Sequence, residues 1–203
     1  MRASIIIAVA CLSLAVVFAS CSGGNGDGNG SRDGVAGDER PEVTVPDEGP
    51  LSGIETYQVL GRTHVETPNV DYPVEPPVGG DHDQAWANCG FYVEPVDTEQ
   101  GVHSMEHGAV WVTYRPDLPD PQVAVLADLV ADHRYVLVSP WPGELASPVV
   151  LSAWGVQLEV ASATAASVDA FVEEFEEAYQ APEPGAPCTG GVGEPVVTAR
   201  TPS

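Results

Sequence analysis

The chain has 203 residues, of which 43% are hydrophobic and 18% charged, a composition that fits one globular domain with polar tails rather than a wholly disordered chain. Thirty Asp and Glu stand against seven Arg and no Lys, so the formal net charge at pH 7 is −23. Because this charge repels phosphate backbones and anionic lipid surfaces, direct binding of nucleic acid is excluded as the function.

The N-terminus has the pattern of an export signal. Met1 and Arg2 precede an uncharged apolar stretch over residues 3–18, which is too short for a membrane-spanning helix. The next residues, Phe18-Ala19-Ser20-Cys21, resemble the lipobox of bacterial lipoproteins, in which the cysteine is acylated, with palmitate for example, and becomes the first mature residue. Phe stands where Leu is usual, so ordinary signal cleavage and secretion form the alternative.

We therefore expect a signal peptide over residues 1–20 and a protein anchored through Cys21 to the extracytoplasmic face of the cell membrane. Residues 21–50 are rich in Gly and acidic side chains without hydrophobic periodicity, and they predict a disordered tether. Residues 51–191 have the composition of a single globular domain, with an irregular Pro/Gly-rich N-terminal half. Residues 192–203 lack periodicity and are expected to fray.

Clear secondary-structure patterns begin at residue 109. The β-branched and aromatic run over residues 109–114 predicts a central strand. Asp120-Pro121 is a helix-start signal, and the apolar spacing that follows predicts an amphipathic helix over residues 121–132. Residues 134–138 then predict a buried strand.

The remaining elements complete an α+β pattern. Residues 149–160 predict another extended segment, bent at Gly155. One apolar face then marks a second helix, formed by Val168, Phe171, Val172, Phe175 and Tyr179. The order of elements predicts a small mixed sheet with two packed helices.

The cysteines predict one disulfide. Cys11 lies in the export signal and Cys21 at the lipidation site, which leaves Cys89 and Cys188 as a single pair in an exported domain. A nucleophilic Cys89 paired with a histidine is the less favoured alternative, because two cysteines in an exported domain are usually oxidised.

Histidine is the most informative residue type for function. Four of the five histidines fall in one stretch: His64, His82, His103 and His107. His103 and His107 share a face whether their segment is a helix or a strand. Because neutral imidazole is a common ligand of zinc and copper, we expect a Zn or Cu site with His82 as third ligand and His64 as the next candidate. The thioether of Met105 would favour Cu(I).

The same segment admits two other interpretations. His103-Ser104-Met105-Glu106-His107 has the form of the inverted zinc-peptidase motif, H-x-x-E-H, in which the glutamate is the general base. We discount peptidase activity because Gly101 and Gly108 limit the segment to about two helical turns. The histidines and Glu106 can also be structural, satisfying buried backbone groups and nothing more.

Several longer motifs resemble a bacterial family catalogued as domain of unknown function 3105. They are Tyr72-Pro73-x-x-Pro76-Pro77-x-Gly79-Gly80-x-His82-x-x-x-Trp86-x-x-Cys89-Gly90-x-Tyr92, Val102-His103-Ser104-Met105-Glu106-His107-Gly108, Ser152-Ala153-Trp154-Gly155 and Pro182-Glu183-Pro184-Gly185-Ala186-Pro187-Cys188. The resemblance spans about residues 57–191 and implies an exported or lipid-anchored protein. It carries no catalytic role onto any residue.

Together these observations predict a lipid-anchored extracytoplasmic protein that binds, stores or hands over a Zn or Cu ion, with a metal-transfer or envelope protein as partner. The alternative is a non-catalytic cell-envelope interaction module whose His and Glu side chains are structural. An enzyme is the least favoured class.

Overall fold

The structure is a computed structural model that describes residues 43, 44, 46, 48–66 and 70–200. The predicted signal peptide over residues 1–20, the predicted lipidation site Cys21 and most of the predicted tether therefore lie outside the described residues. Among the residues that are described, none of the helices has the length and apolar character needed to span a bilayer.

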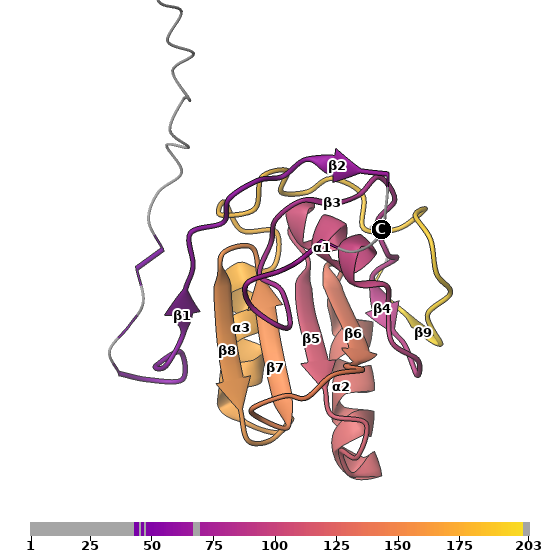
Figure 1. Ribbon diagram of the computed structural model, residues 1–203. Coiled ribbons are helices and arrows are strands. Elements are labelled where there is room, and N and C mark those ends of the chain that lie inside the picture. Colours follow the sequence, from indigo (N-terminus) through magenta and orange to yellow (C-terminus); the bar gives the residue numbers. More distant parts are fainter. Residues whose placement is uncertain (1–42, 45, 47, 67–69, 201–203) are drawn as a thin grey trace, which may run out of the picture. The chain divides into compact units, whose positions relative to one another are not determined.

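A mixed seven-stranded sheet organises the described chain, in the order β1-β8-β7-β5-β6-β4-β9 (Figure 1). β5 is central, as predicted, and pairs in parallel with β6 and antiparallel with β7. The predicted α+β class is therefore confirmed. The strands are β1 Glu55–Thr56, β4 Gly90–Phe91, β5 Val110–Tyr114, β6 Val136–Pro140, β7 Val149–Ala153, β8 Val156–Val160 and β9 Val197–Thr198.

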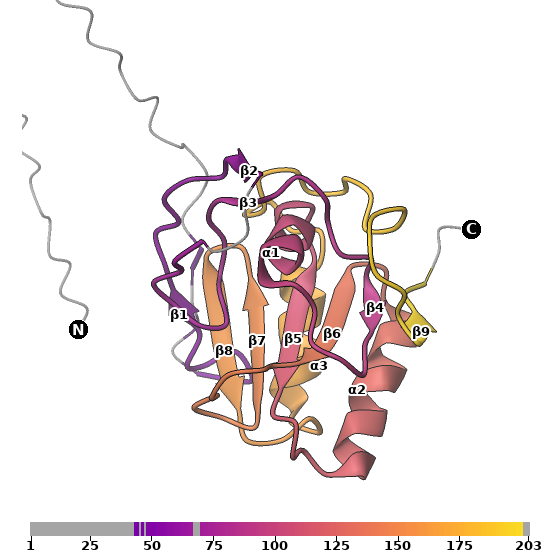
Figure 2. The ribbon, with the colours of Figure 1, turned by 45° about the vertical axis from the view of Figure 1, so that its right-hand side comes forward.

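Three helices in the described part of the chain cover the two faces of the sheet. α2 (Asp120–Asp132) and α3 (Ala166–Phe175) lie on one face, and α1 (Thr98–Glu106) lies on the other (Figure 2). Alternation along β5 explains the two layers, because Val110 and Val112 belong to the core under α2 and α3 whereas Trp111 belongs to the core under α1. The sequence predicted α2 and α3 and left the conformation of the α1 segment open.

Two predicted elements differ from those observed. The single bent segment over residues 149–160 is a hairpin of β7 and β8, because Gly155 takes a φ of +78° and reverses the chain. The second helix ends at Phe175, so Tyr179 does not extend its apolar face and is 53% exposed. Helix α3 stops there because Glu176 leaves the helix and its carboxylate accepts hydrogen bonds from the backbone N–H groups of Arg134 and Tyr135 (2.7 and 2.8 Å).

The expected fraying of residues 192–203 is wrong over most of that segment. Backbone bonds join Asn88 to Val192, β9 pairs antiparallel with β4, and Ala199 is buried in the core. A two-residue strand has too little periodicity to be recognised in a sequence. Residues 201–203 lie outside the part of the chain that is described.

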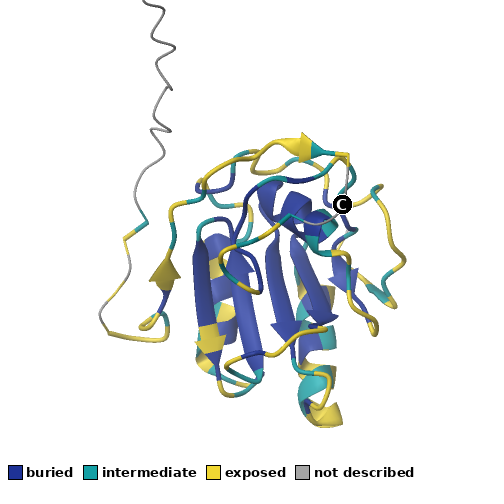
Figure 3. Cartoon of the chain, in the orientation of Figure 1, coloured by how far each residue is buried: buried dark blue, intermediate teal, exposed yellow. Residues whose placement is uncertain are grey.

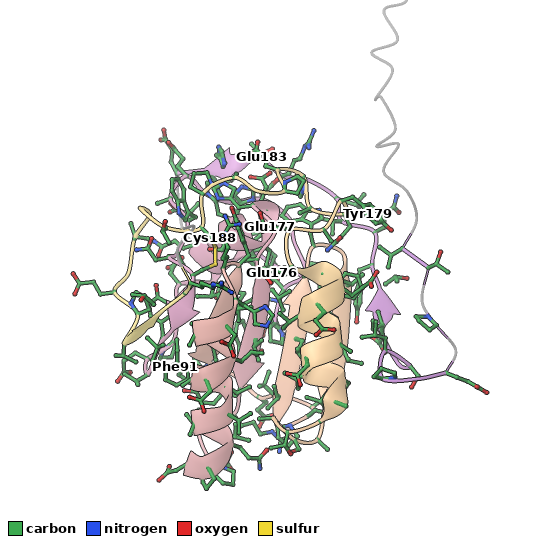
Figure 4. All side chains as sticks on the ribbon, turned by 180° about the vertical axis from the view of Figure 1, so that it is seen from behind. Phe91, Glu176, Glu177, Tyr179, Glu183 and Cys188 are labelled. Atoms are coloured by element: carbon green, nitrogen blue, oxygen red, sulfur yellow. A yellow bond between two sulfur atoms is a disulfide. The ribbon has the colours of Figure 1, made fainter. Side chains whose placement is uncertain are left out.

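The predicted disulfide between Cys89 and Cys188 is confirmed. It joins the residue before β4 to the segment after α3, which is seen from behind in Figure 4 with Cys188 and Glu183 labelled. That segment closes the C-terminal end of α1, since the N–H groups of Glu183 and Gly185 donate to the carbonyls of Glu106 and His107 (2.9 and 3.1 Å). The disulfide thus anchors the chain that satisfies the free carbonyls of α1.

Candidate metal centre

A second, two-stranded sheet lies over helix α1. Its strands β2 (His64–Val65) and β3 (His82–Asp83) are parallel, and their register places His64 opposite His82. The backbone N–H of His82 also donates to the carbonyl of Thr63 (3.0 Å), which fixes this register. Two of the predicted ligands are therefore brought side by side from segments 18 residues apart.

Helix α1 supplies the other donors. It begins where the Asp97 side chain accepts from the backbone N–H of Gln100, and its last turn carries His103 and Glu106 three residues apart on one face. His64, His82, His103 and Glu106 each contribute a ligand atom, and these four atoms lie within 4.8 Å of one another. Three predicted ligands therefore converge.

His107 follows α1 directly and also faces the group. Its Nε2 lies 3.1 Å from Nε2 of His103, so it touches the set of four through that histidine. Together the residues His64, His82, His103, Glu106 and His107 are called the His/Glu cluster below.

Glu106 is the cluster member that the sequence did not predict as a ligand. The sequence pattern indicates a general base of a peptidase or a structural role, yet the Glu106 carboxylate supplies one of the convergent donor atoms. The spacing of three residues from His103 would have indicated this once the segment was known to be helical.

In three of the histidines, a backbone carbonyl holds the ring nitrogen Nδ1. In each case Nδ1 lies within hydrogen-bond distance of a carbonyl oxygen, and because a carbonyl only accepts, Nδ1 carries the proton. The pairs are His82 with Gly80 (2.8 Å), His103 with Asp83 (2.8 Å) and His107 with Pro187 (2.7 Å). This arrangement leaves the Nε2 lone pairs free and is typical of metal-binding histidines.

The Nε2 atoms consequently face other hydrogen-bond acceptors, namely a second imidazole nitrogen or the Glu106 carboxylate. In their neutral forms His103 and His107 direct two lone pairs at each other across 3.1 Å. His82 Nε2 lies 2.9 Å from Glu106 Oε2, close enough for an ion pair, but it is buried and lacks a hydrogen bond of acceptable angle. A proton or a metal ion is needed to make these contacts favourable.

Burial decides which histidines hold a proton. It lowers the pKa of His103 to about 4, helped by the neighbouring imidazoles, and it lowers the pKa of His107 despite the Pro187 carbonyl. Burial also acts to lower the pKa of His82, but the Glu106 carboxylate and the Gly80 carbonyl outweigh it and raise that pKa. Burial would raise the pKa of Glu106, yet His82 holds it below its usual range. Without metal, His82 beside Glu106 therefore holds a proton more readily than His103 or His107 does.

Aromatic rings close the cluster on its inner sides. The Trp86 ring lies 5.6 Å from that of His103 and 5.1 Å from that of His107, and Trp154 meets His82 edge-on at 6.1 Å. Met105, which lies between His103 and Glu106 in the sequence, is fully buried in the core with Trp111. The expectation that a Met105 thioether favours Cu(I) stays a prediction.

The donor set matches the chemistry of Zn²⁺ or Cu²⁺. Zn–N and Zn–O bonds of about 2.0–2.1 Å in a tetrahedral site put neighbouring ligand atoms about 3.3 Å apart. Within the cluster, distances of 2.9 Å (His82 to Glu106), 3.1 Å (His103 to His107) and 3.8 Å (His64 to Glu106) lie around that value. Imidazole nitrogens with one carboxylate oxygen suit these two ions.

Comparison with known proteins supports the resemblance seen in the sequence. The model of a family described as "Protein of unknown function (DUF3105)" matches residues 64–190, which include the whole cluster and both cysteines of the disulfide. No curated protein and no solved structure matches the chain. Since the matched segment is more than half of the chain, this protein belongs to the DUF3105 family.

Proposed function

We propose that this protein binds one Zn²⁺ or Cu²⁺ ion in the His/Glu cluster and holds it for transfer, outside the cytoplasm and anchored to the membrane through Cys21. The observation that supports metal binding most strongly is the orientation of the imidazoles. Three Nδ1–H groups donate to backbone carbonyls, so buried Nε2 lone pairs point at one another and at a carboxylate. An ion would bond at once to His82, His103 and Glu106, whose ligand atoms converge with that of His64.

The composition of the site favours exchange over permanent storage. The ligands are imidazoles and one carboxylate, without the thiolates of very tight zinc sites, because both described cysteines form the disulfide. On loading, the proton shared by His82 and Glu106 would be released, so metal affinity would depend on pH.

Elemental analysis of the purified full-length protein tests metal binding. After dialysis against Zn²⁺ or Cu²⁺ and removal of free ion, we expect about one ion per chain. His82→Ala and His103→Ala would each remove it, while His133→Gln serves as the matched control, because His133 binds Glu176 outside the cluster. Absence of bound metal in the unaltered protein would contradict the proposal.

The membrane anchor requires a separate test. Replacement Cys21→Ala should block lipidation and release the protein from the membrane fraction or halt its processing. Cys11→Ala is the control, because that cysteine lies within the apolar export segment. If the Cys21 variant fractionated with membranes as the unaltered protein does, the anchor would be disproved.

A cell-envelope interaction module without metal is the second candidate. It draws support from the same backbone bonds, since His103 ties α1 to β3 through Asp83 and His107 ties the end of α1 to the segment after α3 through Pro187. On this account His103→Ala would lower the melting temperature of the protein, and there would be no metal to lose.

A further inference from the structure

We propose that His64 is the entry ligand of the metal centre: it takes the ion from a small chelate in solution and passes it to the buried donors His82, His103, His107 and Glu106. This inference rests on the proposed metal-binding function and adds the route and the order in which the ligands act.

Exposure separates His64 from the rest of the cluster. Its side chain is 50% exposed, whereas those of His82 and Glu106 are 0% and 5% exposed. In Figure 3, strand β2 is exposed while helix α1 beneath it is buried. Within the described part of the chain, His64 is therefore the cluster member that an incoming ion meets first.

The position of His64 also suits transfer to the inner donors. Its ring stacks on His103 with centroids 4.8 Å apart and meets His82 edge-on at 4.9 Å. Its Nε2 lies 3.8 Å from Glu106 Oε2. An ion bound to His64 therefore needs to move by only a few ångströms to reach the carboxylate and the next imidazole.

Buried donors remain when His64 lets the ion go. A ring nitrogen of His82, a ring nitrogen of His103 and the Glu106 carboxylate lie within 4.8 Å of one another, and Nε2 of His107 lies 3.1 Å from Nε2 of His103. With His107 drawn in, three nitrogens and one oxygen would satisfy tetrahedral coordination. Backbone carbonyls hold Nδ1 of His82, His103 and His107, whereas no such bond to His64 is observed among the described residues. The His64 ring is therefore the least constrained of the four.

Transfer proceeds by ligand exchange without redox chemistry. A bond forms between His64 Nε2 and the ion as one donor atom of the chelate leaves. Bonds to Glu106 and the buried imidazoles then form, the chelate dissociates, His82 loses its Nε2 proton to solvent, and the His64 bond breaks. Release follows the reverse order, so one residue governs both directions.

Stopped-flow kinetics with Cu²⁺-nitrilotriacetate tests this role in the full-length protein. Tryptophan fluorescence reports binding, because Trp86 lies over His103 and His107. For His64→Ala we expect association and dissociation rate constants to fall together by at least tenfold, with the dissociation constant changed less than threefold. His64→Glu, which keeps a ligand at the entrance, should restore most of the rate. Thr63→Ala, an exposed neighbour, is the control and should leave both rates unchanged.

The outcomes distinguish this inference from the proposed function. An unchanged association rate in His64→Ala would overturn the entry role, and so would a faster dissociation rate, which would make His64 a permanent ligand. Failure of the unaltered protein to bind Cu²⁺ or Zn²⁺ at all would instead overturn the proposed function on which the inference rests.

Discussion

The two faces of the central sheet are packed with different chemistry. Under α2 and α3 the core is largely aliphatic and aromatic, with Val112, Leu126 and Phe171 fully buried. Under α1 the sheet turns Thr113, Ser139, Ser152 and Gln157 inward beside tryptophans, and the His/Glu cluster lies above them. We call these the aliphatic face and the polar face.

The difference separates stability from function. Burial of apolar side chains on the aliphatic face supplies a large, non-directional stabilisation. Every buried polar group on the polar face needs a partner, which Trp111 finds in Ser139 (3.1 Å) and Gln157 finds in Ser152 and the Pro76 carbonyl (3.0 and 2.8 Å). A buried polar atom without a hydrogen-bond partner among the described residues, such as Nε2 of His82, is therefore a candidate for a ligand.

The largest effect is expected on the aliphatic face. Phe171→Ala removes a fully buried ring that packs against Phe175 at 4.6 Å, and it should lower the free energy of unfolding by about 3–5 kcal/mol. Urea denaturation measures this change. The folded fraction should still bind metal with unaltered affinity, and a loss of affinity would show that the two faces are not separable.

Removing the disulfide should affect both faces. Cys89→Ser with Cys188→Ser is expected to cost about 2–5 kcal/mol of unfolding free energy, because the bridge closes a long loop. Metal affinity should fall as well, since Pro187, next to Cys188, holds Nδ1 of His107. Calorimetric titration with Zn²⁺ measures the second effect, and unchanged affinity would mean that His107 is positioned independently of the bridge.

Acid should destabilise the metal-free protein through the polar face. The pKa of His103 is about 4 when folded and near 6.5 when unfolded, so the unfolded chain binds the proton more tightly and stability falls as the pH drops from 6.5 to 4. The loss should reach about 3 kcal/mol. The raised pKa of His82 does not add to this loss, because its contribution is fully present below pH 6.5.

Thermal unfolding of the metal-free protein across this pH range checks the sign. His103→Gln should flatten the pH dependence, whereas His133→Gln, outside the cluster, should leave it in place. A melting temperature that was higher at pH 4 than at pH 6.5 would contradict the burial of a neutral His103.

The smallest effect is expected from a hydrogen bond beneath the cluster. The Ser104 hydroxyl donates to the carbonyl of Ala87 (2.8 Å), and this bond ties α1 to the chain before β4. Ser104→Ala should lower the unfolding free energy by about 1 kcal/mol and leave metal stoichiometry unchanged. Chemical denaturation and elemental analysis of one preparation test both statements.

Sequence periodicity predicted the aliphatic face better than the polar face. β5, α2 and β6 have runs of apolar residues long enough to show a period. Strands β2 and β3 have two residues each, and α1 contains Gly101, which lowers helix propensity but is needed because a Cβ there would lie 2.6 Å from the Trp111 ring.

The candidate site was predicted only in part for the same reason. The histidines were recognisable by type and by the spacing of His103 and His107. Their convergence depends on the register that places His64 beside His82, which is set by backbone bonds between irregular segments. Glu106 was missed as a ligand because its role follows from the helical conformation of α1.

X-ray absorption spectroscopy of the Zn²⁺-loaded full-length protein tests the central claim most directly, because it reports the atoms bonded to the ion. The account predicts a four-coordinate shell at about 2.0 Å with the multiple-scattering signature of three imidazoles and one additional oxygen. A shell of oxygens alone, without imidazole scattering, would contradict the assignment of the His/Glu cluster as a metal centre.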